Sequence, residues 1–258
     1  MSAASALPAF DGFRLQGKRA LVTGAGRGLG LAAAAALARA GAAVTLAARS
    51  LAELEAGCAA IRAEGGAADF IVLDVTDSDA VAREIRARPP FHVLVNNAGM
   101  NRPKLLVDTQ DEDIDAVFAL NVKATFYVSR EVARSLQAAG QAGSIINVSS
   151  QMGHVGSPRR TLYCASKHAV EGMSKALAWE LGSTGIRVNT LCPTFIETAL
   201  TAPMFEDAAF RRFVLERIAL ARLGRIDEVM GPIVFLASDA SSLMTGSSLM
   251  LDGGWTAA

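Results

Sequence analysis

The chain has 258 residues, of which 51% are hydrophobic and 19% charged, and its 25 basic and 25 acidic side chains balance at neutral pH. A chain with this apolar content can bury a large core, which excludes global disorder. Zero net charge excludes the basic footprint of a protein that binds nucleic acid or a membrane surface. The N-terminal segment lacks the pattern of a signal peptide, no apolar run reaches the roughly 20 residues that span a bilayer, and the cysteines show no metal-ligand or disulfide pattern. We expect a cytoplasmic protein with no metal, no nucleic-acid partner and no membrane partner.

Short apolar runs alternate with helical patterns from one end of the chain to the other. The strand-like runs are residues 19–24, 42–49, 69–75, 91–99, 143–150, 185–193 and 247–254. The helical patterns are residues 28–41, 50–66, 76–87, 109–140, a helix around Tyr163, and 226–239. The apolar runs lack polar alternation, which is typical of parallel strands buried on both faces.

This alternation predicts an α/β fold with a single Rossmann-like, doubly wound domain over residues 1–258. We expect a parallel sheet of about seven strands with helices on both faces, preceded by a loose N-terminal extension at residues 1–14. Ser50 and Glu53 have the spacing of a capping box at a helix start. Ligands of such sheets bind where the strands end, so functional residues are expected directly after the strands.

A glycine-rich turn, "TGAGRGLG", follows the first strand and has Gly24, Gly28 and Gly30 in a G-x-x-x-G-x-G spacing, with Gly26 between them. Such a turn lets the backbone approach a pyrophosphate at the N-terminus of the next helix. The alternative is a tight turn with a close helix–strand contact, since a single glycine motif is weak evidence. The position at the first strand–helix junction favours the phosphate site.

The end of the second strand indicates which nicotinamide cofactor would bind. A site that binds the ribose 2′-hydroxyl of NAD(H) needs a carboxylate there. Ala47, Ala48 and Arg49 occupy these positions instead. Arg27, inside the glycine turn, adds a second cation. Two guanidiniums without a carboxylate suit a 2′-phosphate and favour NADP(H) over NAD(H), which stays possible. The alternative is two solvated surface arginines.

Polar residues also follow the third and fourth strands. Asp74 is a candidate to accept a hydrogen bond from an adenine amino group, and equally a candidate N-cap of the next helix. Asn97 follows the fourth strand in "NNAG". Because Asn side chains bond to nearby turn backbone, we expect a structural role for Asn97 even if a cofactor passes over it.

Several motifs resemble those of the short-chain dehydrogenase/reductase family, in the same order and spacing over nearly the whole chain. They are "TGAGRGLG", "NNAG", "ALNVKAT", "INVSS", "YCASK", "RVNTLCPTFIET" and "LDGGW". The resemblance implies an NAD(P)-dependent oxidoreductase that transfers hydride between a nicotinamide cofactor and a secondary alcohol or ketone. It also implies a homotetramer or a homodimer.

The family's catalytic set maps onto Asn121, Ser150, Tyr163 and Lys167. By this resemblance, Tyr163 transfers the proton, with its pKa lowered by Lys167 and by the positive nicotinamide. Ser150 donates to the substrate oxygen, Lys167 also bonds the nicotinamide ribose, and Asn121 holds a water that relays protons. Ser149, the neighbouring hydroxyl, is interpreted as a strand-end residue.

The resemblance also implies a cofactor-binding set that follows the strand ends. It comprises Gly24, Arg27, Gly28, Leu29, Gly30, Arg49, Asp74, Val75, Asn97, Ala98, Gly99, Tyr163, Lys167, Pro193, Ile196 and Thr198. The Ile196 backbone and the Thr198 hydroxyl would hold the nicotinamide carboxamide. Thr194 stands where the family usually has glycine, so the turn there is expected to differ.

The substrate is expected to be a small polar molecule of the sugar, polyol or sugar-acid type, by analogy alone. Candidate contacts are Ser150, His154 and Tyr163. Arg102, Arg159 and Arg160, together with His154, are candidates to recognise a carboxylate or a polyhydroxy substrate. The alternative for Arg159 and Arg160 is exposed charges at a helix start or subunit contacts. A mobile lid is expected at residues 198–213.

Two other functions stay open at this point. One is a 3-oxoacyl thioester reductase of the same family, although residues 136–144 and 179–185 lack the basic side chains that acyl-carrier-protein reductases carry near these helix ends. The other is a cofactor-binding protein that senses without turnover. A degraded catalytic set would favour that second function, and here the set is complete.

Overall fold

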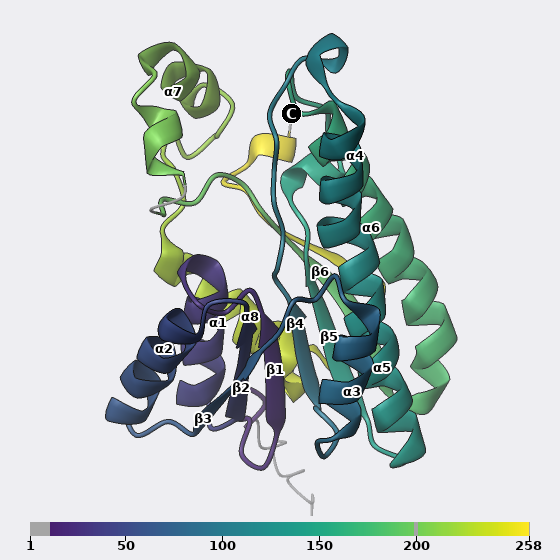
Figure 1. Cartoon of the computed structure of the whole chain (residues 1–258). Helices are drawn as coiled ribbons and strands as arrows, with labels where there is room; N and C mark the ends of the chain where they lie inside the picture. Colours follow the sequence, from purple (N-terminus) through teal and green to yellow (C-terminus); the bar gives the residue numbers. More distant parts are fainter. Residues whose placement is uncertain (1–10, 199–200, 258) are drawn as a thin grey trace, which may run out of the picture.

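The structure is a computed structural model that describes residues 11–198 and 201–257 (Figure 1). Seven parallel strands form one sheet in the order β3-β2-β1-β4-β5-β6-β7. The strands are β1 Arg19–Thr23, β2 Ala43–Ala48, β3 Ala68–Val72, β4 Val93–Asn96, β5 Gly143–Val148, β6 Ile186–Pro193 and β7 Ser248–Leu251. The helices are α1 Gly28–Arg39, α2 Leu51–Ala63, α3 Ser78–Arg86, α4 Asp111–Phe118, α5 Ala124–Ala138, α6 Thr161–Leu181, α7 Ala208–Leu215 and α8 Met230–Ala237.

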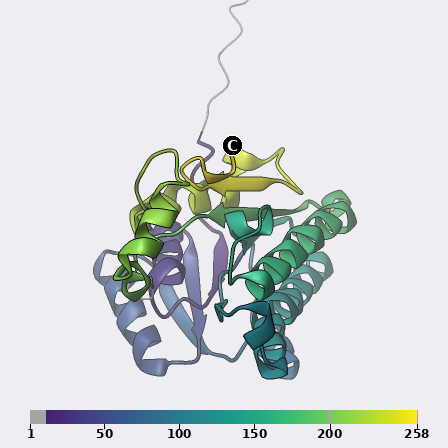
Figure 2. The same cartoon turned by 90° about the horizontal axis from the view of Figure 1, so that it is seen from above.

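Helices cover both faces of the sheet, which confirms the predicted doubly wound α/β fold (Figure 2). One core joins the sheet to α1, α2 and α8, and the other joins it to α3, α5 and α6. β1 pairs with β2 on one side and with β4 on the other. The strand order therefore reverses beside β1, and this switch point is where such sheets bind ligands.

The long helix expected at residues 109–140 is interrupted by a π turn. α4 leads into the π turn Ala119–Lys123, and α5 continues from Ala124. The inserted residue shifts the register of the helix and points Asn121 inward, so that this side chain is only 1% exposed. π turns of this kind often mark functional sites.

The N-terminal extension is shorter than expected. The Gly12 carbonyl accepts the N–H of Ala240 at 2.9 Å, and the rings of Phe13 and Phe235 lie 6.4 Å apart. Residues 11–14 are therefore attached to the α8 region, and the prediction of a loose segment is wrong for them. Residues 1–10 lie outside the described residues.

Most of the segment predicted as a mobile lid, residues 198–213, forms helical structure above the sheet. Residues 199 and 200 lie outside the described residues, and the mobility of the lid stays a prediction. Beyond β6 a short 3₁₀ turn, Ala202–Phe205, precedes α7. Figure 1 shows α7 apart from both helix layers, above the edge where the strands end. Phe195, Phe205 and Phe210 pack their rings together with centroids 5.7–5.8 Å apart. Within the described residues, no helix is long and apolar enough to cross a membrane.

Candidate active site

The glycine turn after β1 has the geometry of a phosphate cradle. Gly24 and Gly28 have φ angles of +62° and +57°, which residues with a Cβ rarely adopt. A Cβ on Gly30 would lie 2.3 Å from the carbonyl oxygen of Gly24, whereas nothing lies within 4 Å of the Cβ position of Gly28. The turn is closed on the sheet side and open where α1 begins, at Gly28 and Leu29. It therefore fits a pyrophosphate at the N-terminus of α1.

Two residues hold this turn in place: Thr23, the last residue of β1, and Asn97, which follows β4. Asn97 Nδ2 donates to the carbonyl oxygens of Thr23 and Gly24, each at 3.1 Å. The Thr23 hydroxyl accepts the backbone N–H groups of Asn97 and Ala98 at 3.1 and 3.2 Å. The structural role predicted for Asn97 is confirmed. Thr23 shares that role, and only the contact between strands reveals it.

The two arginines expected to bind a 2′-phosphate are exposed, but Arg27 has a carboxylate beside it. Arg27 Nη1 lies 3.3 Å from Glu53 Oε1. The interpretation that no carboxylate lies near this site is therefore wrong. The cause is that α2 begins beside the glycine turn, where a Cβ on Gly26 would lie 2.6 Å from Glu53 Oε2. Ser50 caps α2 by accepting the Glu53 N–H at 3.4 Å, while the Glu53 side chain turns to Arg27.

Asp74 lies exposed just beyond β3. Its carboxylate accepts the hydroxyl and the N–H of Thr76 at 2.7 and 2.9 Å. These hydrogen bonds, followed in size by the charge of Arg49, lower the pKa of Asp74 against its partial burial. Asp77 caps α3 by accepting two backbone N–H groups at 3.0 Å, so the N-cap alternative for Asp74 is wrong. Val75 is buried, and a contact between Asp74 and adenine stays a prediction.

Tyr163 and Lys167 share one face of α6, as their spacing predicts. Lys167 Nζ lies 5.6 Å from the centroid of the Tyr163 ring and donates to the Val148 carbonyl at 2.8 Å. Lys167 is 6% exposed. This burial lowers the pKa of its ammonium to about 8, although the charges of Cys192 and Glu171 act to raise it. The ammonium is therefore tied to the end of β5, within reach of the phenol.

The phenol of Tyr163 is less acidic here than in a free tyrosine. Burial raises its pKa to about 12, against the lowering effects of a hydrogen bond with Ser150 and of the charge of Arg160. The expectation that Lys167 lowers this pKa is wrong for the chain by itself, because burial dominates and the ammonium bonds to Val148. The chain's own residues therefore keep Tyr163 protonated at neutral pH.

Ser150 follows β5 and caps a short 3₁₀ turn, Gln151–Gly153. Its hydroxyl accepts the N–H of Met152 at 3.1 Å and donates to Gln151 Oε1 at 2.7 Å. The residue is 6% exposed. Together with the bond to Tyr163, these contacts hold the hydroxyl beside the phenol. Its single O–H is donated to Gln151, so it must turn away from Gln151 to donate to a substrate oxygen.

Asn121 links the segment after β4 to α6. Its Oδ1 accepts the N–H of Met100 at 2.8 Å, and its Nδ2 donates to the Met100 carbonyl at 2.9 Å and to Ser166 Oγ at 3.0 Å. Ser166 Oγ donates in turn to the Tyr163 carbonyl at 2.8 Å. A Cβ on Gly99 would lie 3.3 Å from Asn121 Oδ1. Sequence reasoning gave Ser166 no role, and its place between Asn121 and Tyr163 appears only in the fold.

The loop after Pro193, at the end of β6, is held by its own threonines. Ile196 is buried, and its carbonyl accepts the Thr201 hydroxyl at 2.6 Å. The hydroxyls of Thr198 and Thr201 lie 3.1 Å apart. The Thr198 hydroxyl is thus held at the carboxyl edge of the sheet by Thr201, and its contact with the nicotinamide carboxamide stays a prediction.

Thr194 keeps an ordinary backbone where the family usually has glycine. Its φ lies outside the left-handed region, so the turn does not require glycine at this position. Its hydroxyl oxygen is buried and has no hydrogen-bond partner among the described residues. Such an orphaned polar group fits a polar ligand beside this loop, and the nicotinamide end of a cofactor has the groups to satisfy it.

His154, Glu171 and Cys192 form a cluster one helical turn beyond Lys167, on the face of α6 that carries Tyr163 and Lys167. His154 Nε2 lies 3.5 Å from Glu171 Oε1 and 3.6 Å from Cys192 Sγ. Glu171 also accepts the Ser248 and Thr190 hydroxyls at 2.6 and 3.0 Å. Glu171 is therefore satisfied by described residues, and a substrate contact by the partly exposed His154 stays a prediction.

The three candidate arginines have different environments. Arg102 lies 3.0 Å from Asp113 and is already paired. Arg159 is exposed, with a φ of +59°, which matches the interpretation of a helix-start charge. Arg160, the next residue, is only 6% exposed. The interpretation of an exposed charge is therefore wrong for Arg160.

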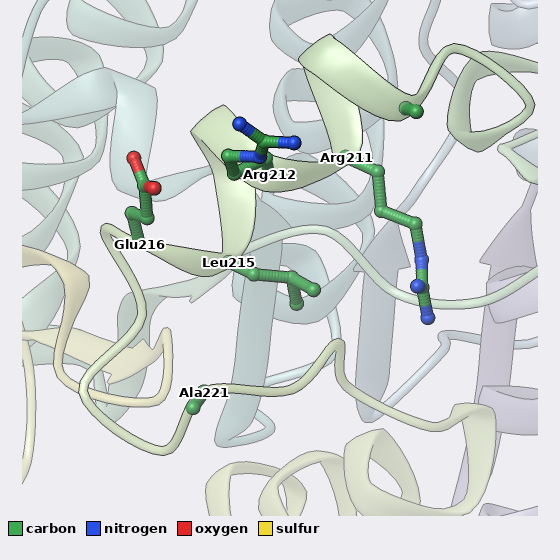
Figure 3. Close-up of a pocket in the computed structure, with 6 residues that line it drawn as sticks. Arg211, Arg212, Leu215, Glu216 and Ala221 are labelled. Atoms are coloured by element: carbon green, nitrogen blue, oxygen red, sulfur yellow. The ribbon is translucent and has the colours of Figure 1, made fainter.

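A hollow on the lid involves none of the catalytic candidates. It is lined by Ala208, Arg211, Arg212, Leu215, Glu216 and Ala221 (Figure 3). All these residues belong to α7 and the loop that follows it. The candidate active site is therefore defined by the strand ends and by α6, not by this hollow.

The doubly wound sheet, its glycine cradle and the Tyr163–Lys167 pair define the class of oxidoreductases that bind a nicotinamide dinucleotide. Residues 24–256 match the family described as enoyl-(acyl carrier protein) reductase. The chain belongs to the short-chain dehydrogenase/reductase family, which confirms the resemblance.

Known proteins with different substrates resemble this chain. D-erythrulose reductase of Gallus gallus is 40% identical, over 93% of this chain and 96% of that protein. A 3-oxoacyl-(acyl carrier protein) reductase of Thermotoga maritima is 42% identical, over 93% of this chain and 98% of that protein. The structure of a gluconate 5-dehydrogenase from Burkholderia cenocepacia, in complex with NADP and tartrate, has a TM-score of 0.92 and 38% identity, covering 95% of this chain and 98% of that one.

Proposed function

We propose that the chain is an NADP(H)-preferring oxidoreductase that interconverts a secondary alcohol and a ketone in a small polar substrate of the sugar, polyol or sugar-acid type. The observation that carries this proposal is the placement of Ser150, Tyr163 and buried Lys167 together at the carboxyl edge of the sheet. The test is a panel of ketoses, polyols, aldonates and simple alcohols, assayed by nicotinamide absorbance with NADP(H) and NAD(H) side by side. Turnover of no sugar-type substrate would contradict the proposal.

In the proposed mechanism, the phenol oxygen of Tyr163 donates a proton to the substrate oxygen or accepts one from it. Ser150 donates a hydrogen bond to the same oxygen and stabilises the negative charge that develops there. The bound nicotinamide supplies or accepts the hydride. Because one hydroxyl is fixed beside the other, both can reach a single substrate atom.

Lys167 and Asn121 support this proton transfer. Lys167 uses one N–H on the Val148 carbonyl, which leaves two for ribose hydroxyls and for the electrostatic stabilisation of a phenolate. Asn121 positions α6 through Ser166, and we assign to it the water that relays protons from Lys167 to solvent. The π turn supplies this inward position.

The proposed cofactor set is the one that the sequence motifs define, with the glycine turn at the pyrophosphate and Arg27 and Arg49 at the 2′-phosphate. Both arginines are exposed at the ends of the first two strands. NADP bound to the gluconate 5-dehydrogenase relative supports the preference. Glu53 weakens it, because the carboxylate competes with a phosphate for Arg27, and NAD(H) stays the alternative.

Reduction of a 3-oxoacyl thioester is the second candidate activity. The description of the matching family and the 42% identity to the Thermotoga maritima reductase favour it. The lack of lysine and arginine at residues 136–144 and 179–185 counts against it. Acetoacetyl-CoA assayed beside the sugar panel distinguishes the two. A non-catalytic role in sensing is disfavoured by the complete catalytic set.

We also propose that residues 1–258 act as one domain in a cytoplasmic homotetramer, with a homodimer as the alternative. Trp179 on α6 is 90% exposed and Phe126 on α5 is 46% exposed. Large apolar side chains on neighbouring helices favour a subunit interface. Val117 on α4, by contrast, is fully buried and belongs to the interior.

A further inference from the structure

Arg160 is a buried cation that no described residue neutralises. It stands at the N-cap of α6 and is 6% exposed. No carboxylate and no carbonyl oxygen of the described residues accepts from its guanidinium, whose one described contact is the Phe210 ring at 5.9 Å. Arg187 shows the usual solution, since its guanidinium donates to Ser241 and to three backbone carbonyls.

An unpaired buried guanidinium is costly, because burial removes its hydration without providing a counter-charge. Desolvation accordingly lowers the pKa of Arg160, against only weaker raising effects of Tyr163 and Cys164, and no carboxylate of the described residues opposes it. Arginines that are buried in proteins normally have a carboxylate or a set of carbonyl partners. The counter-charge for Arg160 is therefore expected from a bound ligand.

The position of Arg160 indicates that this ligand is the substrate rather than the 2′-phosphate of the cofactor. Arg160 precedes Tyr163 by three residues at the start of α6, so both side chains emerge on one side of the helix, and the guanidinium lies close enough to the phenol to lower its pKa. Phe210 of α7 covers the guanidinium from the lid side. Arg160 therefore lies between the reacting phenol and the lid, in the space that a substrate enters. The 2′-phosphate candidates Arg27 and Arg49 lie at other strand ends.

We propose that Arg160 binds the carboxylate of the substrate, so that the active site selects hydroxy and keto acids over neutral polyols and ketoses. This inference rests on the proposed function and narrows its substrate class to anions. The planar guanidinium can bind a carboxylate through two parallel hydrogen bonds, while the phenol and Ser150 hold the reacting oxygen. Phe210 then closes over a neutralised ion pair rather than over a free cation.

Tartrate and threitol test this proposal without requiring turnover. They share a four-carbon diol, but tartrate carries two carboxylates where threitol carries hydroxymethyl groups. Each is titrated calorimetrically into the NADP⁺-loaded protein. We expect tartrate to bind the wild type and threitol to bind more weakly. Arg160→Gln should weaken tartrate binding by about 10- to 100-fold, the range expected for charge-assisted hydrogen bonds, and leave threitol unchanged.

The control variant is Arg159→Asn, which removes the same charge one residue away at an exposed position and suits the positive φ there. It should bind tartrate as the wild type does. Arg160→Lys keeps the charge without the planar fork and should give intermediate affinity. The NADP⁺ affinity and the unfolding temperature of Arg160→Gln show whether this variant is folded. If it is not folded, Arg160→Lys replaces it in the comparison.

Several results would overturn the proposal. They are no tartrate binding by the wild type, equal binding of tartrate and threitol, equal loss in Arg159→Asn, or a matching loss of NADP⁺ affinity in Arg160→Gln. The last would show that the cofactor supplies the anion. Arg160-dependent tartrate binding in a protein that turns over neither gluconate nor sorbitol would instead uphold the anion site and contradict the proposed activity.

Discussion

The ionisation of Tyr163 depends more on burial than on charge. Its position against the strand ends raises the pKa to about 12, and Arg160 and Ser150 only partly offset this. The sequence spacing places Lys167 beside the phenol, but its ammonium donates a hydrogen bond to the Val148 carbonyl instead. The phenol is therefore a proton donor by default, and it becomes a base only when further positive charge arrives in the site.

The pKa of Tyr163, with and without cofactor, can be measured in a Tyr127→Phe variant. The chain has only two tyrosines, so Tyr163 is then the only one that titrates. The folded-state pKa of Tyr163 lies above the ordinary value of about 10, so its phenolate forms at higher pH than in the unfolded chain. Without cofactor, we expect no phenolate absorbance from Tyr163 up to the ordinary tyrosine pKa, and added NADP⁺ should shift the titration downward. Phenolate at neutral pH in the cofactor-free variant would contradict this reasoning.

If Arg27 binds the 2′-phosphate as proposed, Glu53 restrains the preference for NADP(H). Its carboxylate is 3.3 Å from Arg27, and an exposed pair of this kind is worth about 0.2–1 kcal/mol. Glu53→Gln frees the guanidinium, so the Kd for NADP⁺ should fall by about 1.4- to fivefold while that for NAD⁺ is unchanged. Fluorescence titration measures both constants. The control Glu55→Gln removes a nearby exposed charge on α2 and should leave both Kd values unchanged. An equal effect of Glu55→Gln would mean that NADP⁺ binding responds only to the overall loss of negative charge.

At the scale of elements, the junction between β1 and α1 has the least room for change. A Cβ on Gly30 would lie 2.3 Å from the Gly24 carbonyl oxygen and 2.5 Å from Asn97 Nδ2. Both groups belong to the hydrogen-bonded frame of the turn, so neither can move without breaking it. The close approach explains why a glycine is needed within α1, where glycine otherwise weakens a helix.

Gly30→Ala should therefore destabilise the fold by about 1–3 kcal/mol through overpacking and abolish NADP⁺ binding. The matched control is Gly172→Ala in α6, where nothing lies within 4 Å of the added Cβ. That substitution should be neutral or stabilise the protein by up to about 1 kcal/mol. Thermal unfolding of both variants, with and without NADP⁺, makes the comparison. Similar behaviour of the two would contradict the cradle geometry.

Sequence patterns predicted the elements well, because periodicity and chain order are local properties. The seven strands, the glycine turn and the shared face of Tyr163 and Lys167 follow from them. Contacts between side chains far apart in the chain do not. No spacing rule brings Glu53 to Arg27, and the burial of Arg160 beside an exposed Arg159 depends on where α7 lies.

At the scale of the whole molecule, the two faces of the sheet present different outer surfaces. The layer of α3, α5 and α6 carries the exposed Trp179 and Phe126. The opposite layer of α1 and α2 has Leu51 exposed at 48%. An exposed tryptophan on the α5–α6 side favours that side as the subunit interface.

Trp179→Glu should accordingly weaken the assembly and shift the protein towards smaller species in sedimentation velocity. The expected cause is that a carboxylate in an apolar interface loses its hydration without a partner. Leu51→Glu, on the other layer of helices, should leave the sedimentation coefficient unchanged. A wild-type monomer, or an equal effect of both substitutions, would contradict the assignment of the interface.

In the proposed mechanism, the Tyr163 phenol transfers the proton while the rest of the site binds the cofactor. Tyr163→Phe removes one oxygen from this group and leaves the ring, α6 and the glycine turn in place. The decisive measurement is turnover of the best substrate of the panel by this variant, together with its Kd for NADPH. We expect turnover to fall by at least about 10²-fold with the Kd unchanged within a few-fold. Near-normal turnover with intact cofactor binding would contradict the mechanism.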